Sequence, residues 1–465
     1  MQQHLDDLIE QLKSPSPEAR LRAARELGQL GPAAGCAATP LLELLRRLED
    51  ADACRAVRDA LAAVAPERKK TWETEERAGG KRRKGQEFAR QRSETAVGPK
   101  PRVISLFSGC GGMDLGFVRA GFEIVWANDV MKDACATYRR NLGAHVCCQD
   151  VRSIDPGQLP ACDVVIGGPP CQGYSVAGRM DPDDPRSALT WEFVRLVGRL
   201  RPGAFVLENV KALATLKRWE AVRARLLAAL AGLGYTVRAH LLDARCYGVP
   251  QGRERVFFIG TAAELPGVES IPPSAGQPCT AGEVLRSLPR PGVEPNLGVC
   301  RAKVVPAKKP VLRPSPFAGM LFNGQGRPID LNSTVNTLPA SMGGNRTPIV
   351  DEGELREGLP SWIIEYHTHL QGGGAPWAKA PDRLRRITVT EAALLQTFPL
   401  EFRFEGKQTS QYTQIGNAVP PALAEAVAAR VLQALNGSLT SRGTRENYGS
   451  LRQREERESV RPRET

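Results

Sequence analysis

The chain has 465 residues and a formal net charge of +12, and 25% of its residues are charged. That length can hold more than one domain and a large hydrophobic core. No run of about 18 apolar residues occurs, so we expect no membrane span. Residues 1–10 carry acids and no apolar stretch, so we expect no secretory signal. The positive charge suits a polyanionic partner without identifying one.

The 11 cysteines are an odd number, Cys147 and Cys148 are adjacent, and no CxxC pair occurs. This pattern fits neither a disulfide framework nor a zinc site. We therefore expect reduced thiols in a cytosolic protein, most of them small core residues, with reactivity confined to a special setting. The five histidines show no ligand spacing, so we expect no metal.

Residues 1–66 carry apolar side chains at helical spacing, and Pro32 and Pro66, 34 residues apart, close two similar units. We expect helices at 19–30, 41–48 and 52–64. The module resembles a pair of HEAT-like helical repeats, and a plain helical bundle is the alternative. Either way we expect an all-α module that contacts a protein partner and performs no chemistry.

Residues 67–102 hold 12 Lys/Arg and 6 Asp/Glu. Their net charge of +6 is half of the +12 carried by the whole chain. We interpret them as a basic linker, either a solvated tether or an extra contact with a phosphate backbone. Residues 437–465 are rich in Arg, Glu and Ser, and we expect a disordered tail there.

Between these segments, short apolar strands alternate with helices. This alternation predicts an open, mostly parallel α/β sheet, which binds ligands at the carboxyl ends of its strands. The expected strands are 103–107, 122–127, 163–166, 204–207 and 255–259, and the expected helices are 131–141, 187–200, 217–232 and 420–435.

The first strand leads into the glycine-rich segment SGCGG at 108–112, where a ligand could approach the backbone closely. Asp129 ends the second strand, where an acid can bind both hydroxyls of a ribose, and Asp150 is placed to accept from an adenine amino group. We therefore expect a cofactor that contains adenosine. These residues alone do not separate a nicotinamide cofactor from S-adenosylmethionine, and a tight turn with surface acids is the simpler alternative.

Strand 163–166 feeds a Gly-Gly-Pro-Pro turn, and the next side chain is the thiol of Cys171. A cysteine in an ordinary turn is inert. A cysteine held at the top of a sheet beside a cofactor pocket is a candidate nucleophile.

Six segments stand out in order along the chain: FSGCGG at 107–112, GPPCQ at 168–172, ENV at 208–210, QGRER at 251–255, RIT with Glu391 and LQTFP at 386–399, and QIGNAVP at 414–420. In this order they resemble the motifs of the DNA (cytosine-5) methyltransferase family, and the resemblance covers about 103–435. Thr390 stands where the family often has arginine, which puts only a packing or backbone contact in doubt.

The resemblance implies a Rossmann-like domain, dependent on S-adenosylmethionine, at 103–260 and 385–436, with a target recognition domain at 261–384. Cys171 would add to C6 of a flipped-out cytosine. Glu208 would bond N3 and the exocyclic amine, Arg255 would contact O2, and Arg253 would help to hold the site. The implied cofactor-binding residues are Phe107, Ser108, Gly109, Gly111, Gly112, Asp129, Val130, Asp150, Val151, Gly168, Pro170 and Asn417.

Residues 172–186 resemble a loop that closes over the flipped base. Within 261–384, the stretch from Arg301 to Arg327 holds six Lys/Arg and no acid, which suits contact with phosphates. The Gly-rich loops 323–327 and 341–347 carry side chains that can read bases.

We thus expect a DNA (cytosine-5-)-methyltransferase acting on duplex DNA as a monomer, in the bacterial cytosol, either in a restriction-modification system or as a solitary methylase. A tRNA cytosine C5-methyltransferase built from the same motifs is the first alternative, and the long recognition region argues against it. A catalytically dead nucleic-acid binder and a nicotinamide oxidoreductase are disfavoured by Cys171, Glu208 and the arginine pair.

Overall fold

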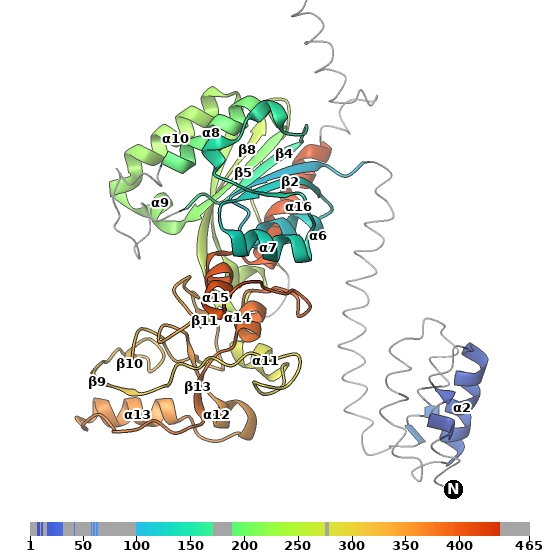
Figure 1. Cartoon of the computed structure of the whole chain (residues 1–465), viewed down its shortest axis with the longest axis vertical. Coiled ribbons are helices and arrows are strands. Elements are labelled where there is room, and N and C mark those ends of the chain that lie inside the picture. Colours follow the sequence, from blue (N-terminus) through green and yellow to red (C-terminus); the bar gives the residue numbers. More distant parts are fainter. Residues whose placement is uncertain are drawn as a thin grey trace, which may run out of the picture. The chain divides into compact units, whose positions relative to one another are not determined.

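The structure is a computed structural model that forms two compact units, Met1–Pro99 and Lys100–Thr465, and each is considered by itself (Figure 1). The residues it describes are 7–9, 11–12, 16–30, 41, 57, 59–60, 62–63, 99–170, 188–274 and 279–437.

In the first unit, α2 (Pro17–Leu30) corresponds to the expected helix 19–30. Its buried face includes Ala24 and Leu27, and a Cβ on Gly28 would lie 3.0 Å from the Cα of Ala60. This helix therefore packs tightly against the segment around Ala60. Most of the other helices expected in 1–66, the basic linker up to 98 and the tail from 438 lie outside the described residues, and the HEAT-like repeat stays a prediction.

In the part of the chain that the structure describes, the second unit is built on a seven-stranded sheet of order β3-β2-β1-β4-β5-β8-β6. The pairs among β1 to β5 are parallel, and β8 runs antiparallel to both of its neighbours. The predicted open, mostly parallel sheet is confirmed. The strands are β1 (Arg102–Leu106), β2 (Glu123–Asp129), β3 (Val146–Cys148), β4 (Val164–Gly167), β5 (Ala204–Val210), β6 (Tyr235–Asp243) and β8 (Glu254–Ala262).

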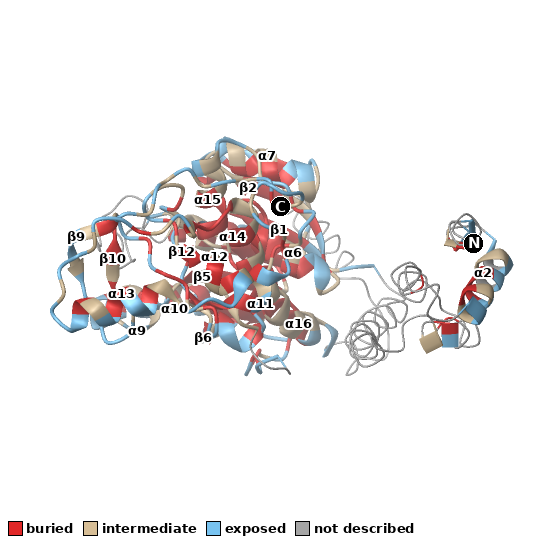
Figure 2. Cartoon of the chain, turned by 90° about the horizontal axis from the view of Figure 1, so that it is seen from below, coloured by how far each residue is buried: buried red, intermediate tan, exposed pale blue. Residues whose placement is uncertain are grey.

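Helices cover both faces of this sheet (Figures 1 and 2). Successive strand residues point to opposite faces, and apolar side chains lie on both, so each face is buried under helices. On one face Val103 and Val206 share a buried cluster with α6, α7 and α16, and on the other Ile104 and Phe205 share one with α8, α9 and α10. The helices are α6 (Gly112–Arg119), α7 (Lys132–Asn141), α8 (Ala188–Leu200), α9 (Lys211–Thr215), α10 (Glu220–Gly232) and α16 (Pro421–Gly437), with short 3-10 turns at Val151–Ser153, Pro156–Gln158, Lys217–Trp219 and Ala244–Tyr247.

The sequence reading missed the two strands at the sheet edges, β3 and β6. β3 has three residues, too few to show a pattern. β6 pairs only with β8, and most of its residues are partly or fully exposed, among them Arg238 and His240. An edge strand needs little apolar surface, so it lacks the signal of a buried strand.

The region after the sheet contains short strands and helices around two buried clusters. One gathers Phe322 and Tyr366 with other aromatic side chains. The other joins Leu285 and Val350 to Leu395 and Ile415, so the segment after 385 shares a core with the predicted recognition domain. The elements are β7 (Gln251–Gly252), α11 (Ala281–Arg286), β9 (Pro306–Val311), β10 (Met320–Phe322), β11 (Val335–Asn336), β12 (Ile349–Asp351), α12 (Glu352–Glu357), α13 (Trp362–Gln371), β13 (Leu384–Arg386), α14 (Val389–Leu395) and α15 (Gln408–Asn417).

The last helix, α16, returns to the sheet and packs on α6. A Cβ on Gly116 would lie 2.5 Å from the Cβ of Ala424 and 2.7 Å from the carbonyl oxygen of Pro421, so the two backbones are in close contact. By length and composition the stretch Gln408–Gly437 could cross a membrane, but half of its apolar window is buried inside the protein. Its apolar character is accounted for by this packing.

We predict that Gly116→Ala destabilises the second unit by roughly 1–3 kcal/mol, because the added methyl group has no room between α6 and α16. The matched control is Gly232→Ala at the end of α10, where an added Cβ would meet no atom within 4 Å. This control should be neutral or stabilising by up to about 1 kcal/mol. Urea unfolding of the full chain measures both, and equal midpoints for the two variants would contradict the prediction.

Candidate active site

The carboxyl ends of β1, β2, β4 and β5 meet along one edge of the sheet. Leu106 pairs with Asn128 on one side and with Gly167 on the other, and Gly167 also pairs with Leu207. The segments that follow these strands therefore start side by side. This edge carries the loop 107–112, Asp129 at the end of β2, the Gly168–Pro170 turn and Glu208 near the end of β5, which are most of the residues predicted for the site.

The loop after β1 departs from extended backbone at once. Phe107 has φ of 54°, which is strained for a residue with a side chain, and Gly109 and Gly111 follow with φ of 55° and 90°. The Ser108 hydroxyl and the Ser108 N–H both donate to the carbonyl of Asn128, at 3.2 and 2.8 Å. These bonds hold the loop against the end of β2.

Asp129 is fixed by backbone donors on two sides. Its carboxylate accepts from the N–H of Gly109 at 2.9 Å and from the N–H of Met131 at 2.8 Å. Burial raises the pKa of Asp129, and these N–H groups act in the opposite direction. The next side chain, Val130, is apolar yet 65% exposed, which leaves an uncovered apolar surface beside the carboxylate.

Asp150 has a different environment from Asp129. It lies near the surface and pairs with the guanidinium of Arg152 at 2.6 Å. The hydrogen bonds from Arg152 lower the pKa of Asp150 to about 2, so this carboxylate is charged at neutral pH. Its neighbour Val151 is buried. The sequence predicted an acceptor for an adenine amino group here and missed the arginine that already engages it.

The Gly168–Pro170 turn touches the end of β5. A Cβ on Gly168 would lie 3.0 Å from a carboxylate oxygen of Glu208, and the side-chain amide of Asn209 donates to the carbonyl of Pro169 at 3.4 Å. Cys171 follows directly, but it lies outside the described residues, as does the predicted loop 172–186.

Glu208 is largely buried and forms an ion pair with Arg255, whose Nε is 3.0 Å from the carboxylate. Burial raises the pKa of Glu208, although Arg255 and Arg253 both lower it. A carboxyl group in this setting holds a proton more readily than an exposed glutamate does. The pairing of β5 with β8 explains the contact. Arg255 lies opposite Val210, and Glu208 precedes Val210 by two residues, so its side chain points to the same face of the sheet.

Arg253 is 1% exposed and lies inside the protein. Its guanidinium donates to the carbonyl of Gly416 at 3.0 Å and to that of Leu338 at 3.4 Å. The sequence predicted that Arg253 helps to hold the site and that Arg255 contacts the base. Arg255 makes the 3.0 Å ion pair with Glu208, and the positive charge of Arg253 also lowers the pKa of that carboxyl group. Arg253 joins β8 to α15 and to the segment around Leu338.

The last motif, at 414–420, lies beside the first, at 107–112. A Cβ on Gly112 would come within 2.5 Å of the carbonyl oxygen of Val419, and the thiol of Cys110 donates to the carbonyl of Gln414 at 3.7 Å. Asn417 ends α15 and is exposed. Residues about 300 positions apart in the chain thus support the same loop.

Asp114 was not singled out from the sequence, yet it supports the glycine loop from below. Its buried carboxylate accepts from the hydroxyl of Ser105 at 3.0 Å and from that of Tyr138 at 2.8 Å. The ring of Tyr138 in turn packs under Gly111, where an added Cβ would lie 3.1 Å from it. Burial raises the pKa of Asp114 to about 6. The signal available in the sequence was an acid in the first turn of an otherwise apolar helix.

A second feature missed from the sequence is Arg385, which ties the recognition region to α14. Its guanidinium contacts the carboxylates of Glu391 and Glu352 at 2.7 and 2.6 Å. Glu391 also closes a capping box with Thr388 at the start of α14. The polar residues of the motif RIT with Glu391 are therefore buried and make hydrogen bonds and an ion pair inside the protein.

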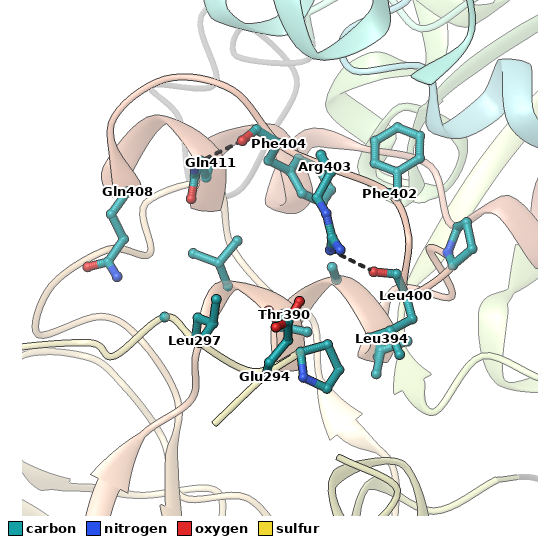
Figure 3. Close-up of a pocket in the computed structure, with 15 residues that line it drawn as sticks. Glu294, Leu297, Thr390, Leu394, Leu400, Phe402, Arg403, Phe404, Gln408 and Gln411 are labelled. Atoms are coloured by element: carbon teal, nitrogen blue, oxygen red, sulfur yellow. Dashed lines mark hydrogen bonds between the residues drawn. The ribbon is translucent and has the colours of Figure 1, made fainter. Parts of the chain in front are cut away.

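A pocket of about 330 Å³ lies between α14, the loop 399–408 and the segment 294–298 (Figure 3). None of the residues predicted for the site lines it. Thr390 does, and this is the position where the family's motif often has arginine. The departure from the family's motif at Thr390 therefore lies at this pocket.

We predict that raising the pH from about 4 to about 6 destabilises the protein through Asp114. Its folded pKa of about 6 exceeds its ordinary value of 3.8, so in this interval the folded state binds the proton more tightly and ionisation lowers the free energy of unfolding. The loss should be about 2 kcal/mol in this interval, out of roughly 3 kcal/mol for the complete titration. Asp114→Asn should lack this loss, and Asp155→Asn, at an exposed acid, should keep it. Urea unfolding across this pH range measures it, and an unchanged slope in Asp114→Asn would refute the prediction.

Comparison with known proteins agrees with this geometry. Residues 101–433 match the family described as C-5 cytosine-specific DNA methylase. The type II methyltransferase M1.HphI of Haemophilus parahaemolyticus is 36% identical over 71% of this chain and 86% of its own length. M.NgoFVII of Neisseria gonorrhoeae is 32% identical over 69% of this chain and 84% of its own.

Solved structures share the fold. The Dnmt2 methyltransferase of S. pombe superposes with a TM-score of 0.51 at 17% identity, over 73% of this chain and 99% of its own. EhMeth of Entamoeba histolytica gives 0.52 at 18% identity, over 74% and 99%. The chain belongs to the C-5 cytosine-specific DNA methylases, enzymes that transfer a methyl group from S-adenosylmethionine to cytosine in DNA.

Proposed function

We propose that Cys171, Glu208, Arg253 and Arg255 perform this reaction on one specific cytosine in duplex DNA. The observation that carries the assignment is the buried Glu208–Arg255 ion pair next to the Gly168–Pro170 turn. An acid with a raised pKa, a cation and the start of a cysteine-bearing turn thus converge at the ligand-binding edge of the sheet.

The cofactor would lie over the loop 107–112 and the end of β2. A Cβ on Gly109 would meet no atom within 4 Å, so the outer side of this loop is open. Asp129 offers a carboxylate for ribose hydroxyls, and Val130 offers an exposed apolar surface for a purine ring. S-adenosylmethionine would supply an electrophilic methyl group there. The other residues assigned to it are Phe107, Ser108, Gly111, Gly112, Asp150, Val151, Gly168, Pro170 and Asn417.

Cytosine C5 is a poor nucleophile, and the proposed role of Cys171 is to change that. Its thiolate adds to C6, and the electron pair of the C5–C6 bond moves into the ring, which makes C5 an enamine-like carbon. Glu208 donates a proton or a strong hydrogen bond to N3, so the negative charge does not build up on the ring. After C5 has accepted the methyl group it loses its proton, and elimination releases the thiol.

The two arginines have separate proposed roles. Arg255 keeps Glu208 oriented by the 3.0 Å contact and places positive charge where O2 of the base would lie. Arg253 is a positioning residue, because its bonds to Gly416 and Leu338 fix the relative position of β8 and the segment before Asn417. The target base must leave the helical stack to reach this edge, which costs a few kcal/mol.

The recognition region offers a basic surface for the DNA backbone. The predicted cluster between 301 and 327 lies on and around β9 and β10, and all six of its cations are exposed. This supports a contact with phosphates, which a salt titration of DNA affinity would test. The cations are Arg301, Lys303, Lys308, Lys309, Arg313 and Arg327.

The relatives M1.HphI and M.NgoFVII are type II methyltransferases, and we propose that this protein likewise methylates a single recognition sequence alongside a restriction nuclease. It would act as a monomer on duplex DNA in the cytosol, with residues 1–66 as a HEAT-like module for a protein partner. The target recognition domain would be 261–384, inserted between 103–260 and 385–436.

We predict that Cys171→Ser and Glu208→Gln each abolish or strongly reduce methylation, while S-adenosylmethionine binds as before. Serine is a far weaker nucleophile toward C6, and glutamine keeps the size of Glu208 but cannot transfer a proton to N3. Loss of general acid catalysis alone should lower kcat by roughly 10²–10⁴. Turnover with labelled cofactor and calorimetric cofactor binding give the two readouts. Wild-type turnover in Cys171→Ser would overturn the assignment of the nucleophile.

We predict that bisulfite sequencing of a plasmid treated with the enzyme shows 5-methylcytosine at one recurring sequence. Parallel assays with duplex DNA and tRNA should label only the DNA. Methylation without sequence preference would contradict the role beside a restriction nuclease. Label on tRNA alone would contradict the proposed substrate.

A further inference from the structure

Two cysteine side chains lie beside Asp129 and Val130, and the proposed methyl transfer uses neither. Cys135, in α7, is fully buried, and Cys148, at the end of β3, is exposed. The thiol of Cys135 donates to the carbonyl of Asp129 at 3.5 Å, and that of Cys148 donates to the carbonyl of Val130 at 3.8 Å. The two thiols therefore donate to the carbonyl groups of two consecutive residues, Asp129 and Val130.

Strand pairing explains why these residues meet. Cys148 lies opposite Asp129 in the parallel pairing of β2 with β3, at the open edge of the sheet. Cys135 reaches the same place from α7, the helix that follows β2 (Figure 1). Burial raises the pKa of Cys135, and the nearby Cys148 thiol contributes to this, which indicates that the two groups interact. Cys147, the other member of the adjacent pair, points to the opposite side of the strand.

We propose that Cys135 and Cys148 form a reversible disulfide when a peroxide is present, and that this bond weakens the binding of S-adenosylmethionine. The proposal rests on the proposed cofactor site at Asp129 and Val130. An exposed thiol beside a buried one, with no other chemical task, is the arrangement that a redox-sensitive pair needs.

The exposed thiol reacts first. The Cys148 thiolate attacks one oxygen of hydrogen peroxide, the O–O bond breaks, and hydroxide leaves, so that Cys148 becomes a sulfenic acid. The Cys135 sulfur then attacks the Cys148 sulfur, the S–O bond breaks, and water leaves after taking up the Cys135 proton. In sum two thiols are oxidised to one disulfide and the peroxide is reduced to two waters. A dithiol reductant reverses the reaction by exchange.

The bond would act on the cofactor site through the backbone. A disulfide has no S–H group, so both carbonyls lose the thiol that now donates to them, and the bond draws the two sulfurs to about 2.05 Å from each other. Those carbonyls belong to Asp129 and Val130, and Asp150 follows Cys148 by two residues. The cross-link therefore pulls on both segments that would contact adenosine, and the carboxylate of Asp129 loses its alignment with Gly109 and Met131.

Binding and oxidation are then thermodynamically linked. If the disulfide raises the dissociation constant of S-adenosylmethionine about tenfold, saturating cofactor must stabilise the dithiol by the same factor. For a two-electron couple this factor corresponds to about 30 mV in reduction potential. The cofactor would thus protect the pair from oxidation.

The test uses the full-length protein, treated with hydrogen peroxide, alkylated and digested with trypsin. We expect mass spectrometry to show peptide 133–139 joined to peptide 141–152, and the joint to be lost on reduction. Cys147→Ser, the matched control, should keep this cross-link, and Cys148→Ser, which retains a donor for the Val130 carbonyl, should lose it. Absence of the joined peptides in the wild type would overturn the proposal.

Cofactor binding is measured by calorimetry, because oxidation of Cys171 would by itself stop turnover. We expect peroxide to raise the dissociation constant of S-adenosylmethionine about tenfold in the wild type and in Cys147→Ser, and to leave it unchanged in Cys148→Ser. A cross-link without this change would overturn the regulatory part. Asp129→Ala in the reduced protein separates the two claims: if it leaves binding unchanged, the proposed cofactor site fails, whatever the cysteines do.

Discussion

The close contact between α6 and α16 is the constraint on which the site depends. Gly116 lets the two helix backbones meet where a single methyl group would clash with Ala424, and Gly112 meets the carbonyl of Val419 in the same way. The loop 107–112 is thereby clamped between the sheet and a helix from the far end of the chain. Its strained Phe107 backbone is maintained because the surroundings leave no alternative.

The electrostatics of the site follow from where the strands end. Glu208 and Asp129 are both carboxylates whose pKa values burial raises, but their surroundings differ. Asp129 receives two backbone N–H groups and suits hydrogen bonding to hydroxyls, whereas Glu208 faces a guanidinium and suits proton sharing with a ring nitrogen. The sheet edge thus holds these two different carboxylates on either side of the Gly168–Pro170 turn, as the proposed division into a cofactor half and a base half requires.

The recognition region is joined to this edge through buried polar bonds rather than through a flexible hinge. Arg253 reaches Gly416 and Leu338, and Arg385 holds Glu391 and Glu352. Buried ion pairs add little net stability but strongly disfavour arrangements that separate their members. These contacts would keep the proposed DNA-contacting surface in a fixed position relative to the proposed base site, which a reaction on one chosen cytosine requires.

From the sequence alone, the α/β class and the strand ends that carry Asp129 and Glu208 could be predicted, because glycine loops and apolar periodicity are local signals. Edge strand β6, the Asp114–Tyr138 support and the different environments of Arg253 and Arg255 could not. These depend on which residues distant in the chain come to face one another, and on how much water that packing excludes. Only the tertiary structure decides burial, which raises the pKa of Glu208, and only the pairing of β2 with β3 and the packing of α7 bring Cys135 beside Cys148.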